Sequence, residues 1–223
     1  MCHFIRRKSL CIYKSISLDL YDHSQLSSFC KAIRSTIMAC IFGDITKIST
    51  TGASEETARQ DKLTLKGVEA SYKMAETDLT RIDQYKAIIQ KVGRAKNMDP
   101  AVIAGIISRE TRGGLHLTKE GYQKDGKGFG LMQVDTGSHQ KSGAWNSEEH
   151  IAQGTEILIG FIKKIQKNFP AWPKEHQFKG GIAAYNFGPG NVRTYERMDV
   201  GTAGNDYSSD VVARSQFFKR KGY

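Results

Sequence analysis

The sequence predicts a mainly helical α+β domain with a small antiparallel sheet. Over several long segments, apolar residues recur at gaps of three and four, the period of an amphipathic helix. Helical periodicity disappears between residues 113 and 143, which hold eight of the 22 glycines and favour short strands and turns. With 223 residues, 39% hydrophobic and 25% charged, the chain is neither collagen-like, coiled-coil nor wholly disordered.

The first 42 residues are expected to form a poorly ordered N-terminal extension, leaving residues 43–223 as the folded domain. The basic start, Met1–Lys8, is followed by a segment too short and too polar for the apolar part of a signal peptide. No cleavable signal is therefore predicted, and the localisation and export route stay open. The cysteines match no zinc spacing and are expected to be free thiols. They are Cys2, Cys11, Cys30 and Cys40.

The first part of the folded domain is expected to be loop and helix. Residues 43–67 are interpreted as loop with one short helix, and residues 68–74 as a second short helix. Residues 79–95 predict a longer amphipathic helix. Its apolar stripe is Leu79, Ile82, Tyr85, Ile88, Ile89 and Val92.

A central helix follows, with Asp99 as its N-cap and Pro100 at its first position. Residues 101–108 are apolar on all faces, so this helix should be buried. It continues through Arg109 and Glu110, and the glycine pair at 113–114 is expected to end it.

The best strand candidate in the glycine-rich segment is Phe129–Val134. Strict alternation would place Met132 and Val134 on one face of this strand. Leu131, Gln133 and Asp135 would then share the other face.

Three helices are predicted in the C-terminal part. The first spans residues 147–168, with Ser147 as N-cap, although His150 stands where a complete capping box has Glu or Gln. Its apolar stripe is Ile151, Ile157, Leu158, Phe161, Ile162 and Ile165. Two prolines follow, and further helices are expected over residues 175–184 and 206–218.

Glu110 is the first candidate for chemistry, because it ends the apolar central helix. Burial disfavours the charged carboxylate and raises its pKa, and the negative end of the helix dipole acts in the same direction. Arg109 and Arg112 would oppose this if they turned inward. A carboxylic acid protonated near neutral pH is what a general acid in glycoside cleavage requires. Taken alone, a glutamate is more often an exposed surface residue.

Two further segments combine polar groups with tight turns. Residues 128–135 (GFGLMQVD) offer an amide and a carboxylate, and residues 183–190 (AAYNFGPG) end a helix with a phenol and an amide. Aromatic rings and amides suit the faces, hydroxyls and N-acetyl groups of sugars. Each segment, taken singly, also has a structural interpretation: an edge strand ended by Asp135, and a helix C-terminus packed on the core.

The order and spacing of these segments resemble the goose-type lysozymes and, more distantly, the soluble lytic transglycosylases of bacteria. The resemblance covers residues 43–223 and leaves residues 1–42 outside it. The segments that carry it are Thr50–Ser54 (TTGAS), Pro100–Glu110 (PAVIAGIISRE), Gly130–Gln133 (GLMQ), Lys179–Asn186 (KGGIAAYN) and Asp210–Arg214 (DVVAR).

The resemblance implies a lysozyme-like fold with a small antiparallel sheet beside the cleft. It also implies cleavage of the β-1,4 bond between N-acetylmuramic acid and N-acetylglucosamine in peptidoglycan, without metal or cofactor. Glu110 would be the general acid. Because the family is regarded as inverting, a second and more distant carboxylate would hold the attacking water.

Two residues are candidates for that second carboxylate. Asp135 matches one family aspartate cleanly. The other family aspartate falls on Lys124, one residue before Asp125, which could serve if the loop shifts. Asp135 is the preferred candidate.

The resemblance also implies a set of sugar-contacting residues. Two alternatives stay open: His139 could be a loop histidine satisfied by backbone, and Ile157 and Phe161 could serve core packing alone. The set comprises Gln133, His139, Ile157, Phe161, Tyr185, Asn186 and Tyr207.

Bird members of the family carry two disulfides, whose four positions correspond here to approximately Cys40 and to Glu55, Lys66 and Asn97. Neither bridge can form, as in the fish branch of the family. Each bridge typically contributes about 2–4 kcal/mol, so a melting temperature below that of the bird enzymes in the same buffer is expected.

The net charge of +10 suits an anionic partner, and peptidoglycan is the one that the resemblance implies. Nucleic acid is not expected, because no recognition helix with interleaved aromatics is present. No apolar run approaches the roughly 20 residues of a membrane span, and a monomer is expected. Two alternatives remain: a lytic transglycosylase, and a non-catalytic cationic wall-binding protein.

Overall fold

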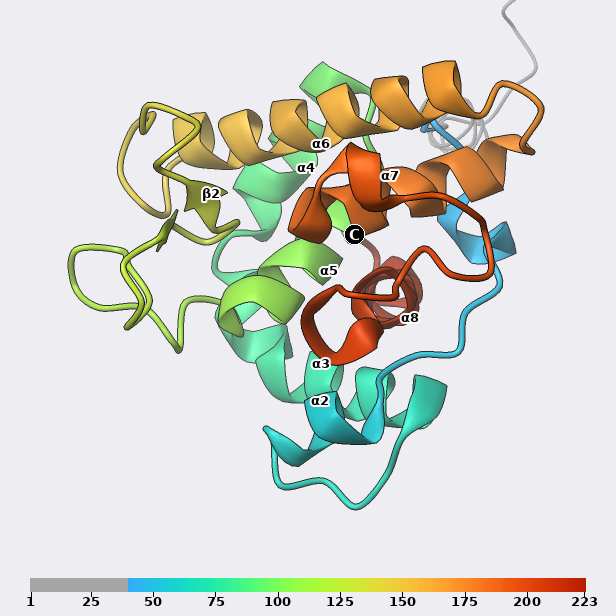
Figure 1. Ribbon diagram of the computed structural model, residues 1–223. Helices are drawn as coiled ribbons and strands as arrows, with labels where there is room; N and C mark the ends of the chain where they lie inside the picture. The colour runs from blue at the N-terminus through green and yellow to red at the C-terminus, as the bar shows by residue number, and fades with distance from the viewer. Residues whose placement is uncertain (1–39) are drawn as a thin grey trace, which may run out of the picture. The chain divides into compact units, whose positions relative to one another are not determined.

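The computed structural model describes residues 40–223 (Figure 1). Almost all of the proposed extension 1–42, including three of the four cysteines, lies outside the described residues. Cys40 is half-buried and free, as expected. The elements, in order, are η1 (Ile45–Lys47), α2 (Glu55–Arg59), α3 (Gly67–Asp83), α4 (Lys86–Lys96), α5 (Pro100–Thr111), β1 (Gly128–Phe129), β2 (Val134–Asp135), α6 (Glu148–Asn168), α7 (Lys174–Phe187), η2 (Pro189–Asn191), η3 (Ala203–Asn205) and α8 (Tyr207–Arg220).

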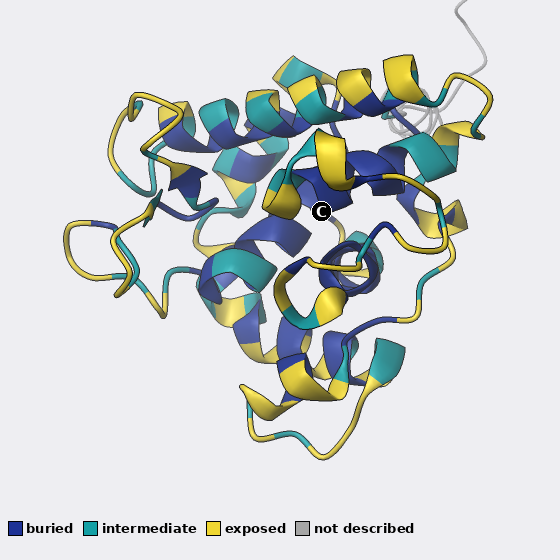
Figure 2. Cartoon of the chain, in the orientation of Figure 1, coloured by how far each residue is buried: buried dark blue, intermediate teal, exposed yellow. Residues whose placement is uncertain are grey.

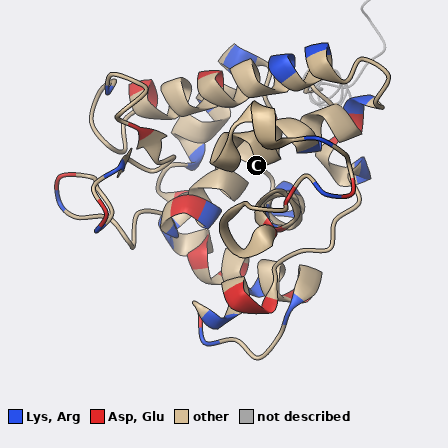
Figure 3. Ribbon diagram, in the orientation of Figure 1, with Lys and Arg blue, Asp and Glu red and all other residues tan. Residues whose placement is uncertain are grey.

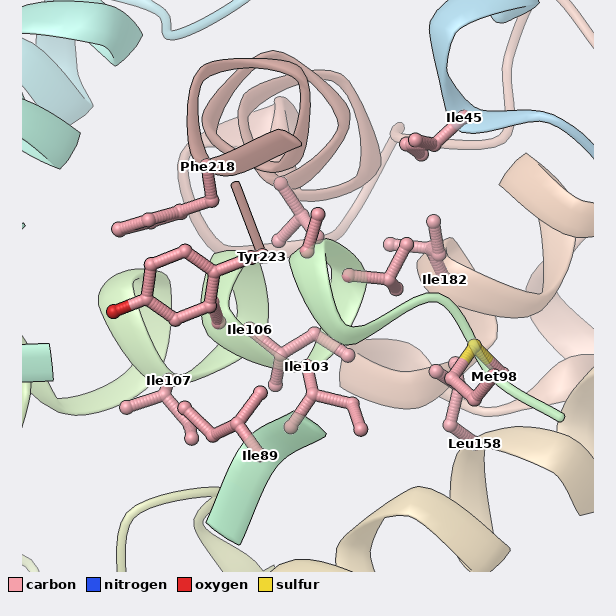
Figure 4. Packing of buried hydrophobic residues seen from close by; sticks show 14 of the residues in the cluster. Ile45, Ile89, Met98, Ile103, Ile106, Ile107, Leu158, Ile182, Phe218 and Tyr223 are labelled. Atoms are coloured by element: carbon pink, nitrogen blue, oxygen red, sulfur yellow. The ribbon is translucent and has the colours of Figure 1, made fainter. Parts of the chain in front are cut away.

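Helix α5 lies at the centre, packed against α3, α4 and α8 (Figures 1 and 2). Residues 101–108 are all buried, as their apolar sequence predicts, and isoleucines of α5 meet Phe218 and Tyr223 in the core (Figure 4). The Asp99 side chain accepts the N–H of Ala101, which confirms the predicted cap. At the other end, Arg112 adopts a left-handed conformation with φ 55° just before the glycine pair and ends the helix after Thr111.

The predicted boundaries of the two preceding helices are wrong. Residues 67–83 form one helix, α3, and the break falls at Tyr85 (φ −103°, ψ 0°), inside the expected helix 79–95. Asp78, which lies between the two expected helices, is buried within α3. Its carboxylate pairs with arginines inside the protein, so a polar residue occupies an inward position of the helix.

The predicted strand Phe129–Val134 is also wrong. β1 and β2 are two short antiparallel strands that pair Gly128 with Asp135 and Phe129 with Val134. The turn between them requires positive φ at Gly130 (74°) and Gln133 (50°). Because the turn interrupts the alternation, Leu131 and Met132 are both buried instead of facing opposite sides.

The three C-terminal helices lie close to their predicted positions. Ser147 caps α6 by accepting the N–H of His150. Helix α6 packs along α7, and α7 contacts α8 (Figure 1). Within the described part of the chain, none of the helices has the length and apolar character that a membrane span needs.

Candidate functional site

Glu110 lies in the last turn of α5 and is half-buried. Burial raises the pKa of its carboxyl to about 7, against the opposing effects of a hydrogen bond from Tyr207 and the charge of Arg109. Burial therefore outweighs both opposing contacts. The carboxyl is half protonated near neutral pH, as the sequence predicts for a general acid.

Tyr207, the first residue of α8, is buried and donates a hydrogen bond from its hydroxyl to Oε1 of Glu110. Burial, together with the Glu110 charge, raises the pKa of the phenol well above its ordinary value. The hydroxyl therefore stays protonated and acts as a fixed donor to Glu110. Tyr207 was expected to contact sugar, and the structure places it directly on the candidate acid.

Both arginines beside Glu110 are paired with other carboxylates. Nη2 of Arg109 lies 2.9 Å from Asp206 and its Nη1 lies 2.6 Å from Asp210. Arg112 turns to Asp78, with Nε 2.7 Å from a carboxylate oxygen. Because both guanidinium groups are engaged elsewhere, neither ion-pairs with Glu110, and its raised pKa persists.

These pairs belong to a buried ionic network between α3, α5 and α8. Arg214 joins its two halves, with Nε 2.9 Å from Asp210 and Nη1 3.5 Å from Asp78. The Ser108 hydroxyl donates to Asp78 at 2.7 Å, two residues before the catalytic candidate. Sequence reasoning missed this network, because charged residues on three separated helices carry no local signal of pairing.

Glu110 and Tyr207 line a cavity of about 190 Å³. Asn186 at the end of α7 also lines it, and its Oδ1 accepts the N–H of Ala203 at 3.0 Å. Gln123 shares the wall and donates from Nε2 to the backbone oxygen of Glu110 at 2.6 Å. The contact ties the glycine-rich loop to the end of α5, and no sequence pattern singled it out.

Asp135, at the end of β2, is exposed and ionised. Its Oδ2 accepts the Ser138 hydroxyl at 2.6 Å and its Oδ1 accepts the N–H of Gly137 at 3.0 Å. These hydrogen bonds hold the pKa of Asp135 below its ordinary value of 3.8. Asp125 is also exposed, in the preceding loop, and accepts the Lys127 N–H at 3.3 Å.

The structure brings several of the expected sugar-contacting residues to the hairpin and α7. The Tyr185 hydroxyl donates to the Met132 carbonyl at 2.8 Å, and the ring of Phe161 meets the Tyr185 ring edge-on at 6.4 Å. Gln133 donates from Nε2 to the Gly130 carbonyl at 2.9 Å.

Three expected contact residues remain open to solvent to different degrees. His139 is exposed, and its N–H bonds the backbone oxygen of Asp135 at 3.0 Å. Ile157 and Phe161 are half-buried at the edge of the α6 stripe, whereas Leu158 and Ile162 beside them are fully buried. That exposure leaves both side chains available for contact as well as packing. Over residues 40–223, no three His, Cys, Asp or Glu side chains cluster as a metal site would require.

The chain is similar to known proteins over most of its length. The family model described as Lysozyme g matches residues 42–222. A lysozyme g of Cyprinus carpio is 64% identical over 83% of this chain and all of its own length. Those of Casuarius casuarius and Gallus gallus are 61% and 56% identical, each over 82% of this chain and over 98% and 86% of their own lengths.

Proposed function

Since the chain belongs to the Lysozyme g family, we propose that it is a muramidase that hydrolyses the β-1,4 bond between N-acetylmuramic acid and N-acetylglucosamine in peptidoglycan. The observation that carries the proposal is the half-buried Glu110, whose pKa of about 7 leaves a proton to donate near neutral pH. The glycosidic oxygen needs this proton, because an unprotonated sugar alkoxide is a poor leaving group.

In the proposed reaction, Glu110 protonates the glycosidic oxygen as its bond to the anomeric carbon breaks. The carboxylate left behind is stabilised by the Tyr207 hydroxyl, whose hydrogen bond strengthens as charge develops on Oε1. Arg109 supports this arrangement indirectly. It is held by Asp206, the residue before Tyr207, and so fixes the start of α8 relative to the end of α5.

In the same displacement, a water molecule would attack the anomeric carbon from the opposite face of the sugar ring as the glycosidic bond breaks, which inverts the configuration. Asp135 is the residue that we assign to holding and deprotonating this water. The lowered pKa of Asp135 keeps its carboxylate able to accept a proton from water at a pH where Glu110 is still protonated. One carboxyl group can then act as the base and the other as the acid. Asp125 is the second candidate, because it lies in the loop that Gln123 ties to Glu110.

Antibacterial defence is the role that we propose for this activity. Basic residues are spread over the visible helices and loops (Figure 3), in keeping with the net charge of +10. Such a charge attracts the anionic bacterial wall and raises the rate of encounter.

Mass analysis of fragments released from peptidoglycan, with the Glu110→Gln variant beside the unaltered protein, tests the proposal. We expect fragments with reducing muramic acid ends from the unaltered protein and none from Glu110→Gln. Fragments lighter by one water would instead identify a lytic transglycosylase. Wall binding without any fragments would identify a non-catalytic binder.

A second pair of variants decides the water-holding carboxylate. Asp135→Asn is expected to lower kcat by at least about tenfold, and Asp125→Asn by less. The reverse order would transfer the role to Asp125.

A further inference from the structure

His150, in the first turn of α6, is a fully buried histidine whose side chain makes a single hydrogen bond with the described part of the chain. Its Nε2 accepts the N–H of Met132 at 3.1 Å, and its Nδ1 has no partner among the described residues. Because Nε2 is the acceptor, the imidazole is neutral and carries its proton on Nδ1. Burying a donor without a partner costs free energy. The protein keeps a histidine here in spite of this cost, which suggests that the hydrogen bond accepted by Nε2 has a role.

The turn between β1 and β2 packs closely against the imidazole ring of His150. A Cβ atom on Gly130 would overlap Cε1 and Nε2 of His150 and would lie 2.7 Å from the Trp145 carbonyl. Phe129 meets the imidazole edge-on, at 5.5 Å and 88°. The turn therefore approaches α6 closely only because residue 130 lacks a side chain.

The same turn connects to both sides of the candidate active site. The carbonyl of Met132 accepts the Tyr185 hydroxyl, so one residue bridges His150 to α7. The neighbouring carbonyl of Leu131 accepts the hydroxyl of Thr111, which follows Glu110 in the chain. A displacement at Met132 would thus move the hairpin relative to the acid.

We propose that His150 is a positioning residue for glycoside cleavage: as a neutral acceptor it fixes the 130–133 turn, and thereby Gln133 and Asp135, relative to Glu110. The proposal rests on the proposed function, because the position of Asp135 affects a rate only if Asp135 takes part in the reaction. His150 itself touches no substrate.

Protonation of His150 would place a second N–H against the N–H of Met132. Burial lowers the pKa of His150 to about 4, so the acceptor is present above this pH and is lost below it. The surrounding charges are engaged elsewhere: Glu148 pairs with Lys91, and Lys141 lies 5.0 Å from the centre of the Phe129 ring.

The remaining charged neighbour, Glu149, is exposed. Its pKa lies below the ordinary value, chiefly through a hydrogen bond from its own backbone N–H and one from Ser147. Among residues 40–223, burial alone accounts for the lowered pKa of His150, with no carboxylate that compensates a charged imidazole.

Two substitutions separate hydrogen bonding from packing. His150→Gln retains an acceptor at the place of Nε2 and cannot titrate, whereas His150→Leu fills space without an acceptor. His176→Gln is the matched control, because His176 stacks on Tyr195 and has no contact with the hairpin turn. For each protein, kcat and KM on soluble peptidoglycan fragments are measured from pH 3.5 to 8.

For His150→Leu we expect kcat to fall about tenfold or more at pH 6, with KM changed by less than about threefold. His150→Gln should keep kcat within about threefold of the unaltered protein and move the acidic limb of its pH profile to lower pH. An unchanged kcat in folded His150→Leu, or an unshifted acidic limb in His150→Gln, would overturn the proposal. If His150→Leu does not fold, the acidic limb of His150→Gln decides. Activity that survives in Glu110→Gln would refute the proposed function instead.

Discussion

At the scale of single residues, the contact between Tyr207 and Glu110 sets the pH range of the proposed acid. A hydrogen bond to a carboxylate stabilises its charged form, so the Tyr207 hydroxyl lowers the pKa of Glu110 against the larger effect of burial. Removing the donor in Tyr207→Phe should therefore raise this pKa above about 7. Because Glu110 acts while protonated, the alkaline limb of the kcat profile should move up by about one pH unit.

The measurement is the pH dependence of kcat on peptidoglycan fragments. Tyr195→Phe is the control, since Tyr195 stacks on His176 and does not contact Glu110. An alkaline limb that moves down in Tyr207→Phe would contradict the assignment of the hydroxyl as a donor to the charged form.

The residues of the site differ in how far the sequence could predict them. Glu110 was identifiable because it ends an all-apolar helix, and its raised pKa follows from that burial. The orientation of the Arg109 side chain could not be predicted, because its partners Asp206 and Asp210 lie about a hundred residues away in the chain. From the sequence, His150 could be recognised only as a residue that leaves the capping box of α6 incomplete. Its hydrogen bond with the backbone N–H of Met132 could not be predicted, because the local sequence pattern does not show which distant turn contacts the helix.

At the scale of elements, periodicity predicted the helices and failed at their interruptions. Helix α5 was recognisable from its cap and its apolar run. The hairpin was not, because the left-handed conformation of Gln133 is one that the alternation rule does not consider. The unbroken α3 was missed because Asp78 is polar and yet inward-facing, which only its buried arginine partners explain.

The closeness of α5 and α8 depends on Gly105. A Cβ at this position would overlap the Ser215 hydroxyl and lie 3.1 Å from the Val211 carbonyl on the facing helix. Gly105→Ala should therefore lower the free energy of unfolding by about 2 kcal/mol, through overpacking. Gly160 in α6 has open space where a Cβ would lie, with no atom within 4 Å, so Gly160→Ala should raise it by about 0.5–1 kcal/mol.

Urea unfolding of Gly105→Ala, Gly160→Ala and the unaltered protein measures the change in the free energy of unfolding that each substitution causes. Both substitutions add the same methyl group to a helix, so helix propensity favours alanine equally in the two cases. Equal effects of the two substitutions would show that the α5–α8 contact does not limit stability.

At the scale of the whole molecule, the buried ionic network joins three helices whose sequences are far apart. Burial alone would raise the pKa of Asp210, but Arg214 and Arg109 outweigh it and hold the pKa below its ordinary value of 3.8. The stabilisation is therefore present above about pH 4 and is lost as the pH falls through the lowered value.

Neutralising this carboxylate leaves two buried arginines undercompensated. Asp210→Asn should lower the free energy of unfolding at pH 7 by about 3 kcal/mol or more, as is typical when one partner of a buried pair is removed. Glu156→Gln, which removes the exposed partner of Lys96, should change it by less than about 1 kcal/mol. Denaturant unfolding compares the two, and a loss in Asp210→Asn no larger than in Glu156→Gln would contradict a structural role for the network.

The net charge of +10 acts on the molecule as a whole and therefore predicts a dependence on substrate charge. Salt screens the attraction to an anionic wall, because the Debye length falls from roughly 30 Å at an ionic strength of 0.01 M to roughly 10 Å at 0.1 M. Lysis of whole bacteria should slow several-fold over that range of salt, roughly as the steered encounter rate falls. Cleavage of a short soluble peptidoglycan fragment whose carboxyl groups have been amidated should change by less than about twofold, because the paired charges around Glu110 are buried and poorly screened. If both rates fell in parallel, salt would be acting on the active site itself, and the surface charge would have no separate part in finding the wall.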